Sequence, residues 1–223
     1  MKPLVDCRLY TFVDTAYLNG RALEIVAQQL CDGGSDLIQL RAKKSSPEEI
    51  RRMAGKILPI TKRANVALVI NDHLEIARKL GAEFCHLGQE DFFDAGYKNV
   101  SELPSSQCFD AASKTQNSKL QIGLSTHSLE QAERALAAGA DYIAVGPVFA
   151  TGTKPTAKPV TLEYVRWAAA NVHVPWFAIG GINLENLDEV LLAGAQCVCV
   201  VSAILNALDV AKACAEFRRR LPT

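Results

Sequence analysis

Polar side chains that could bind an anion alternate along the segment LIQLRAK, residues 37–43. Gln39, Arg41 and Lys43 are two residues apart, and successive residues of a β-strand point to opposite faces, so these three share one face. An amide, a guanidinium and an ammonium group aimed together suit an anionic ligand such as a diphosphate. For this segment alone, a surface loop with ordinary charges is an equally good interpretation.

Two acidic residues follow two other apolar runs. Asp72 comes after VALVI and Asn71, and Asp91 comes three residues after Gly88, which itself follows the run ending at Leu87. If the two runs are neighbouring strands, the carboxylates can converge, and two hard oxygen ligands with water and phosphate oxygens are typical of a Mg²⁺ site. Separately, Asp72 is explained as a helix N-cap and Asp91 as a solvated loop acid, so the prediction depends on the pair.

The loop GPVFATGTKP contains Thr151, Gly152, Thr153 and Lys154 in succession. Hydroxyl groups, a flexible backbone and a cation together can bind a phosphate, although the G-x-x-x-x-G-K pattern of a Walker loop is absent. Gly, Pro and Lys make a poor core, so a purely structural role for this loop is hard to defend.

Three further segments offer groups to a ligand. Gly181 follows the run PWFAIG, and Val201 and Ser202 stand at an expected helix start, where bare backbone N–H groups favour a phosphate. Ser125 ends the run LQIGLS and could bind a substrate oxygen. His127 has no evident partner in the sequence, and a structural or exposed role is favoured over that of a catalytic base.

Eight apolar segments of strand length must position these residues. Four of them begin with a Gly, which suits the left-handed conformation that closes the preceding helix. The segments are RLYTFVD (8–14), GGSDLIQL (33–40), VALVI (66–70), GAEFCHL (81–87), LQIGLS (120–125), GADYIAV (139–145), PWFAIG (175–180) and GAQCVCV (194–200). Helical patterns lie between them, and three begin with a capping residue: Ser46, which precedes Pro47 at the first helical position, Ser128 and Asn183. Strands alternating with helices predict a parallel α/β sheet.

Eight such units predict one (β/α)8 TIM barrel as a single domain over residues 1–223. The absence of G-x-G-x-x-G after the first strand counts against a dinucleotide-binding fold. Polar residues that follow the strands then gather at the C-terminal face, where barrel enzymes carry out their chemistry. Residues 92–119 are polar and have only weak helical periodicity, so we expect an irregular excursion after the fourth strand, with the helix short, displaced or disordered.

The composition narrows the class of protein. The 223 residues are 49% apolar and carry 24 basic and 24 acidic side chains, so no general electrostatic footprint for DNA or RNA is expected. No apolar run reaches the roughly 20 residues of a membrane span, and the first residues do not read as a signal peptide. Among the seven Cys, Cys197 and Cys199 are read as packing thiols in preference to zinc ligands, and we expect a cytoplasmic protein. The sequence does not indicate an oligomeric state.

Taken together, these motifs resemble those of the thiamine-phosphate synthases. The resemblance runs in order through QLRAK (39–43), INDH (70–73), HLGQED (86–91), GLSTH (123–127), DYIAVGPVFATGTKP (141–155), AIGGI (178–182) and VVSAI (200–204). It covers nearly the whole chain, and seven motifs in register are specific although no single one is decisive.

The resemblance implies a transferase that joins a hydroxymethylpyrimidine diphosphate to a thiazole phosphate, or its carboxylated precursor, and releases diphosphate. It implies that Asp72 and Asp91 bind one Mg²⁺ per subunit and that Arg41, Lys43 and Lys154 stabilise the leaving group. The implied contacts to the pyrimidine diphosphate are Gln39, Arg41, Lys43, Asn71, Ser125 and Lys154. Leu40, Ala42 and Gly152 are also expected to bind substrate. Those implied for the thiazole phosphate are Thr151, Thr153, Gly181, Val201 and Ser202.

The sequence departs from the family at three places. Val13 precedes Asp14 where a Thr is usual, so Asp14 is left out of the predicted site; the excursion after Asp91 is long; and His73 replaces a commoner Arg. The nearest alternative is a thiazole tautomerase, whose relatives usually lose the Thr-x-Thr-Lys loop that this chain keeps. A non-catalytic phosphate sensor would not need paired metal acids, and a barrel enzyme of indole or histidine biosynthesis would need an acid–base set that is not evident here.

Overall fold

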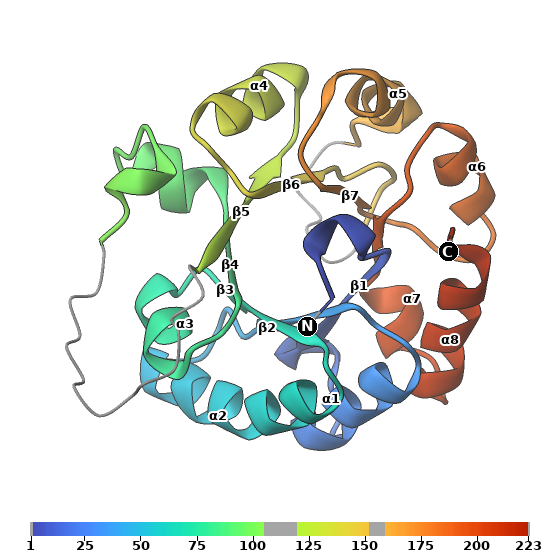
Figure 1. Ribbon diagram of the computed structural model, residues 1–223. Coiled ribbons are helices and arrows are strands. Elements are labelled where there is room, and N and C mark those ends of the chain that lie inside the picture. Colours follow the sequence, from blue (N-terminus) through green and yellow to red (C-terminus); the bar gives the residue numbers. More distant parts are fainter. Residues whose placement is uncertain (1, 105–119, 152–158, 223) are drawn as a thin grey trace.

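Eight parallel strands close into a barrel in chain order, β1-β2-β3-β4-β5-β6-β7-β8 (Figure 1). The computed structural model describes residues 2–104, 120–151 and 159–222. The strands are β1 Leu9–Asp14, β2 Leu37–Arg41, β3 Ala67–Asn71, β4 Phe84–Leu87, β5 Gln121–Thr126, β6 Tyr142–Val145, β7 Trp176–Ile179 and β8 Val198–Cys199. Every predicted apolar segment holds one strand, so the predicted (β/α)8 barrel is confirmed.

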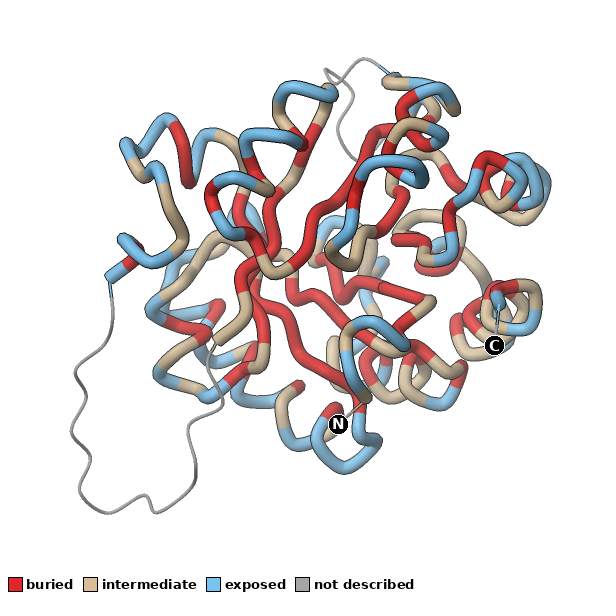
Figure 2. Tube along the Cα trace, turned by 45° about the horizontal axis from the view of Figure 1, so that its top comes forward, coloured by how far each residue is buried: buried red, intermediate tan, exposed pale blue. Residues whose placement is uncertain are grey.

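The barrel closes where its first and last strands meet. β1 pairs with β2 over five residues but with β8 over only two, with Leu9 opposite Val198 and Tyr10 opposite Cys199. The strands are buried and the outward sides of the surrounding helices are exposed (Figure 2). Such continuous burial is expected of a parallel sheet whose two faces are both covered.

Helices form the outer ring of the barrel (Figure 1). The α-helices are α1 Leu23–Asp32, α2 Pro47–Arg63, α3 Leu74–Leu80, α4 Leu129–Ala137, α5 Thr161–Asn171, α6 Leu187–Leu192, α7 Ser202–Leu205 and α8 Val210–Arg220. Short turns of other helix types are η1 Leu4–Asp6, η2 Thr15–Tyr17, the π-helical η3 Glu90–Asp94 and η4 Val100–Glu102. None of the helices in these described ranges has the length and apolar character that crossing a bilayer requires.

Two of the three predicted helix starts are confirmed by their caps. Ser46 accepts a hydrogen bond from the backbone of Glu49, whose carboxylate accepts one in return, and Pro47 is the first residue of α2. Ser128 caps α4 by accepting a hydrogen bond from the backbone N–H of Gln131. The third start was wrong: Asn183 instead accepts hydrogen bonds from the backbone of residues 185 and 186, which forms a turn, and α6 begins only at Leu187.

The fourth strand is followed by η3 and η4, and the next described α-helix is α4, after β5. The irregular excursion expected here is therefore confirmed up to residue 104, and residues 105–119 lie outside the described residues. Phe92 is fully buried, and the Arg134 guanidinium of α4 lies 3.7 Å from the centre of the Phe93 ring. This apolar and cation–π packing holds the described part of the excursion against the barrel.

An aromatic cluster fills the barrel interior. The ring of Tyr142 meets those of Phe84 and Phe177 edge-on, with centroids 5.9 and 5.8 Å apart. It lies against the backbone of Gly123, where an added Cβ would come within 2.0 Å of the Tyr142 ring. Any side chain at position 123 would therefore displace the tyrosine.

Candidate active site

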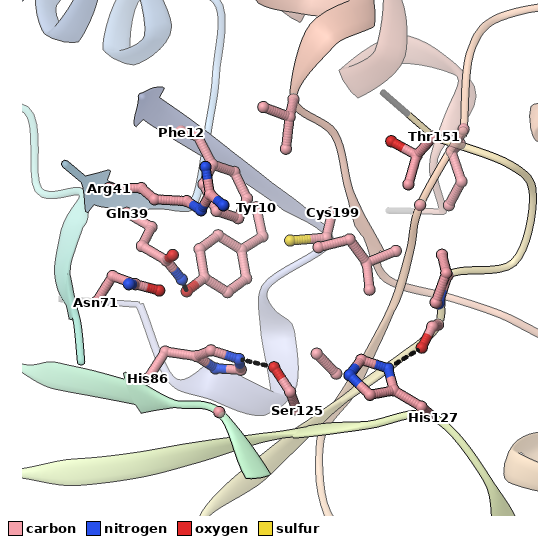
Figure 3. A pocket seen from close by; sticks show the side chains of 18 of the residues that line it. Tyr10, Phe12, Gln39, Arg41, Asn71, His86, Ser125, His127, Thr151 and Cys199 are labelled. Atoms are coloured by element: carbon pink, nitrogen blue, oxygen red, sulfur yellow. Dashed lines mark hydrogen bonds between the residues drawn. The ribbon is translucent and has the colours of Figure 1, made fainter. Parts of the chain in front are cut away.

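One pocket opens at the C-terminal ends of the strands and brings both predicted anion-binding regions together (Figure 3). Its lining includes these predicted residues: Gln39, Arg41, Lys43, Asn71, Asp72, Ser125, Thr151, Gly181, Val201 and Ser202. Arg41 and Asn71 are the last residues of β2 and β3, and Val201 and Ser202 follow β8. The pocket therefore lies on the face where the fold predicts chemistry.

Arg41 is held by a carboxylate that the sequence analysis left out. Its Nη1 donates to Oδ2 of Asp14 at 2.7 Å, and the side chain of Asp14 is only 2% exposed. The other oxygen, Oδ1, accepts from the backbone N–H of Ala16 at 2.9 Å. Asp14 is thus anchored by β1 and η2, and it fixes the direction in which the guanidinium points.

The acidic side of the pocket centres on Asp72. Lys43 Nζ lies 3.4 Å from Asp72 Oδ2, and the amide nitrogen of Asn71 donates to the same oxygen at 2.5 Å. Burial raises the pKa of Asp72, Lys43 opposes this, and the nearby Asp91 raises it further. The predicted convergence of Asp72 and Asp91 is present, and their mutual repulsion is one that a divalent cation would relieve.

The backbone of Asp72 adopts a conformation that residues other than Gly seldom use. Its φ is 63°, in the left-handed region, and its N–H donates to the carbonyl of His86 at 2.9 Å. Aspartate tolerates this region better than most residues do, and such conformations gather at functional sites. The backbone thus turns the Asp72 side chain toward the excursion after β4 that carries Asp91.

On the opposite side, two glycines bring the backbone close to its neighbours. Gly180 has φ 102°, and an added Cβ would lie 2.4 Å from Pro147. Gly181 has φ 66°, and an added Cβ would lie 2.6 Å from the carbonyl oxygen of Ala150. Only Gly fits at either position, so the loop after β7 can lie directly beside the loop after β6.

Two histidines that line the pocket are oriented by hydrogen bonds (Figure 3). His127 Nδ1 lies 2.5 Å from the carbonyl oxygen of Gly146, which can only accept, so this nitrogen carries a proton. His86 Nε2 lies 2.9 Å from Oγ of Ser125. The structural interpretation of His127 therefore fits its bonding, although the residue also faces the pocket.

Some predicted residues are placed differently. Leu40 and Ala42 are 1% and 4% exposed and do not belong to the pocket lining, because their side chains alternate away from Gln39, Arg41 and Lys43. Asp91 is not in the pocket lining, but it interacts with Asp72, which is. The N–H of Gly88 donates to Oδ2 of Asp91 at 3.3 Å. Gly152, Thr153 and Lys154 lie outside the described residues.

Tyr10, Phe12, His86 and Cys199 were not among the predicted site residues, and Asp14 was considered but set aside. Tyr10 and Phe12 stack with centroids 5.4 Å apart and, like His86 and Cys199, line the pocket. Period-two alternation could have linked the residues of β1, because Tyr10, Phe12 and Asp14 are two positions apart.

A family model described as thiamine monophosphate synthase matches residues 9–204 of the chain. A thiamine-phosphate synthase of Halalkalibacterium halodurans is 38% identical over 213 residues, which is 95% of this chain and 94% of the relative. A thiamine-phosphate synthase of Thermus thermophilus is 42% identical over 190 residues, or 85% of this chain and 84% of the relative. These matches span almost the whole barrel.

Similarity to solved structures supports the same family. A thiamine phosphate pyrophosphorylase from Pyrococcus furiosus superposes with a TM-score of 0.78 at 30% identity, covering 97% of this chain and 96% of that one. A 3-hexulose-6-phosphate synthase superposes with a TM-score of 0.60 at 20% identity, covering 96% of this chain and all of that one, a similarity that shows the fold alone.

Proposed function

The chain belongs to the thiamine monophosphate synthase family of transferases, and from this we propose that it joins 4-amino-2-methyl-5-(diphosphooxymethyl)pyrimidine to 4-methyl-5-(2-phosphooxyethyl)thiazole. The products are thiamine phosphate and diphosphate. The observation that carries this proposal is that one and the same pocket is lined by Arg41, Lys43, Asp72, Gly181 and Ser202. One substrate has a diphosphate and the other a phosphate, so two anion-binding regions in one pocket suit the pair.

Arg41 and Lys43 are the residues that we assign to the diphosphate. Asp14 orients the Arg41 guanidinium, which can form two parallel hydrogen bonds to phosphate oxygens. The Lys43 side chain is 47% exposed, and its Nζ can move from Asp72 to a bound anion. Lys154, outside the described residues, is proposed as a third cation.

The acidic residues fit one Mg²⁺. Within the described ranges, no group of three or more His, Cys, Asp and Glu residues is arranged to hold a metal, so Asp72 and Asp91 would supply two carboxylates and the diphosphate and water the rest. A bound Mg²⁺ would neutralise charge that develops on the departing diphosphate.

We propose a dissociative displacement. The bond between the methylene carbon and the diphosphate oxygen breaks, and the oxygen keeps both electrons. Arg41 and Lys43 stabilise the charge that grows there, while the aminopyrimidine delocalises the positive charge of the methylene. The thiazole nitrogen then bonds to that carbon. No protein nucleophile is needed, and holding the two substrates together contributes much of the rate.

The thiazole phosphate is assigned to the loops after β7 and β8. Gly181, Val201 and Ser202 line this side of the pocket, as does Thr151 from the loop after β6. Phosphate binding by the last two loops is frequent in this fold. Nothing in this arrangement distinguishes the thiazole from its carboxylated form, so either is a candidate substrate.

A cytoplasmic location is also proposed, because the six described cysteines carry free thiols.

The test is direct. The purified protein is incubated with both substrates and Mg²⁺, and thiamine phosphate is measured by chromatography, with the thiazole and its carboxylated form compared in parallel. We expect product that depends on both substrates and on the metal. Absence of product with either Mg²⁺ or Mn²⁺ would contradict the proposal.

A further inference from the structure

A continuous hydrogen-bonded chain crosses the interior of the barrel. The amide nitrogen of Gln39 donates to the hydroxyl of Tyr10 at 2.5 Å, as Figure 3 shows, and that hydroxyl lies 3.3 Å from the hydroxyl of Tyr142. The Tyr142 hydroxyl lies 3.2 Å from His86 Nδ1, and His86 Nε2 lies 2.9 Å from Ser125 Oγ. The chain thus joins Gln39 on β2 to Ser125 on β5, two residues of the pocket lining, through three intervening side chains.

The donors in this chain follow from its first bond. Tyr10 accepts from Gln39, so its single proton is available for Tyr142. Tyr142 in turn donates to His86 Nδ1, which makes this nitrogen an acceptor and places the ring proton on Nε2. That proton points to Ser125 Oγ, which leaves the hydroxyl proton of Ser125 for a ligand in the pocket. If the Gln39 amide were turned so that its oxygen faced Tyr10, donor and acceptor would be exchanged in every hydrogen bond of the series.

The central tyrosines are held firmly. Tyr10 and Tyr142 are 1% and 0% exposed, and the ring of Tyr142 fits against the bare backbone of Gly123. Burial raises the pKa of both hydroxyls well above the ordinary value, so both keep their protons. Because packing holds both rings, we expect the hydroxyls to keep their positions when a ligand binds in the pocket.

We propose that Tyr142 is a positioning residue: by linking Tyr10 to His86, its hydroxyl couples the amide orientation of Gln39 to the hydroxyl of Ser125. The inference rests on the proposed function for its ligand, an aminopyrimidine. Gln39 gives its nitrogen to Tyr10 and so offers its carbonyl oxygen, an acceptor that suits an exocyclic amino group. Ser125 offers a donor, which suits a ring nitrogen or a diphosphate oxygen. A heterocycle with donors and acceptors in the opposite arrangement would be rejected because polar groups would be left unpaired.

The first test needs no substrate. Nitrogen-15 NMR shifts of the imidazole report which ring nitrogen carries the proton, and the His86 signals are assigned by their absence from His86→Gln. We expect the Nε2–H form in the wild-type protein and a mixture of both forms in Tyr142→Phe. Tyr164→Phe is the matched control, because the Tyr164 hydroxyl is also buried but donates to Thr126 at 2.6 Å, outside the pocket lining. This control should leave the His86 signals unchanged.

The second test measures turnover. Tyr142→Phe keeps the ring but removes the hydrogen bonds to the hydroxyl of Tyr10 and to Nδ1 of His86, so we expect kcat to fall about tenfold. The KM for the thiazole phosphate should stay unchanged, because that substrate is assigned to the other side of the pocket. Tyr164→Phe should retain wild-type kcat. If Tyr142→Phe does not fold, Tyr10→Phe breaks the same chain one bond earlier.

A structural role for Tyr142 is separated from a positioning role by a mutant cycle. Gln39→Ala and Ser125→Ala are combined in the wild type and again in Tyr142→Phe. We expect non-multiplicative effects on kcat in the first background and multiplicative effects in the second. Equal coupling in both backgrounds, an Nδ1–H form in the wild type, or unchanged kcat in Tyr142→Phe would each overturn the proposal. The NMR result stands even if the wild type makes no thiamine phosphate, so failure of the proposed function is recognised separately.

Discussion

Arg41 and Asp14 form a largely buried ion pair at the mouth of the barrel, with 2.7 Å between Nη1 and Oδ2. Asp14→Asn keeps the backbone cap at Ala16 but removes the charge opposite the guanidinium. We expect the free energy of unfolding to fall by about 2 kcal/mol, because a mostly buried cation loses its partner. We also expect kcat/KM for the pyrimidine diphosphate to fall about tenfold, as the guanidinium is no longer aimed.

Urea unfolding and steady-state kinetics measure these two effects. Glu48→Gln serves as the control, since it breaks the exposed pair with Arg51 on α2 and should change neither quantity. Wild-type kinetics in Asp14→Asn would mean that Arg41 needs no partner to work.

Asp91→Ala tests the metal assignment. Losing one of two carboxylates should lower turnover by at least about a hundredfold at fixed Mg²⁺, because the charge on the leaving diphosphate is then poorly neutralised. Turnover is assayed over a Mg²⁺ titration, and circular dichroism checks that the fold is intact. Asp94→Ala, an exposed acid of the same η3 turn, is the matched control and should behave like the wild type. Near-normal turnover in Asp91→Ala would show that the metal is bound elsewhere.

Gly181→Ala tests the close approach of two loops. Gly181 and Gly81 have nearly the same φ, 66° and 64°, but only at Gly181 does an added Cβ meet other atoms. Both substitutions should lower the free energy of unfolding by about 1–2 kcal/mol, because Ala is disfavoured in the left-handed conformation. Thermal unfolding measures this shared loss. Only Gly181→Ala should also raise the KM for the thiazole phosphate, which steady-state assays determine. Equal KM values in the two variants would argue against a phosphate site at Gly181.

Ser202→Ala tests the same site with a smaller change. We expect the KM for the thiazole phosphate to rise about fivefold, the loss of one hydrogen bond, while the KM for the pyrimidine diphosphate stays the same. Ser128→Ala removes the cap of α4 instead, and it should reduce stability without separating the two KM values. A crystal structure with the thiazole phosphate bound should place its phosphate beside residues 181, 201 and 202. A phosphate found elsewhere in the pocket would contradict this assignment.

The sequence predicted the strands well because each apolar segment is bounded by Gly, polar residues or helix caps. It also predicted polar groups at or just after strand ends, such as Arg41, Asn71 and Ser202, because position along a barrel strand decides what faces the pocket. The start of α6 was predicted too early because both Asn183 and Asn186 can start a turn, and composition alone does not choose between them.

The interior of the site was harder to predict. In β1 every residue is buried, so apolar character does not show which side faces the barrel axis. Tyr10 and Phe12 were missed for this reason, and Asp14 was set aside because Val13 departs from the family pattern. The role of Tyr142 could not be predicted either, because a tyrosine in an apolar strand is normally interpreted as a packing residue. Only the structure shows that its hydroxyl lies beside polar groups from other strands.

The narrow pairing of β1 with β8 has a consequence for the order in which the site is made. β1 leaves the ribosome well before its partner at the seam, Val198–Cys199, because the other six strands lie between them in the chain. Arg41 and Lys43, which are assigned to the diphosphate, emerge early, whereas Val201 and Ser202 follow the closing strand directly. A growing chain therefore holds one half of its pocket before the other, and it would bind both proposed substrates only after the closing strand has been made.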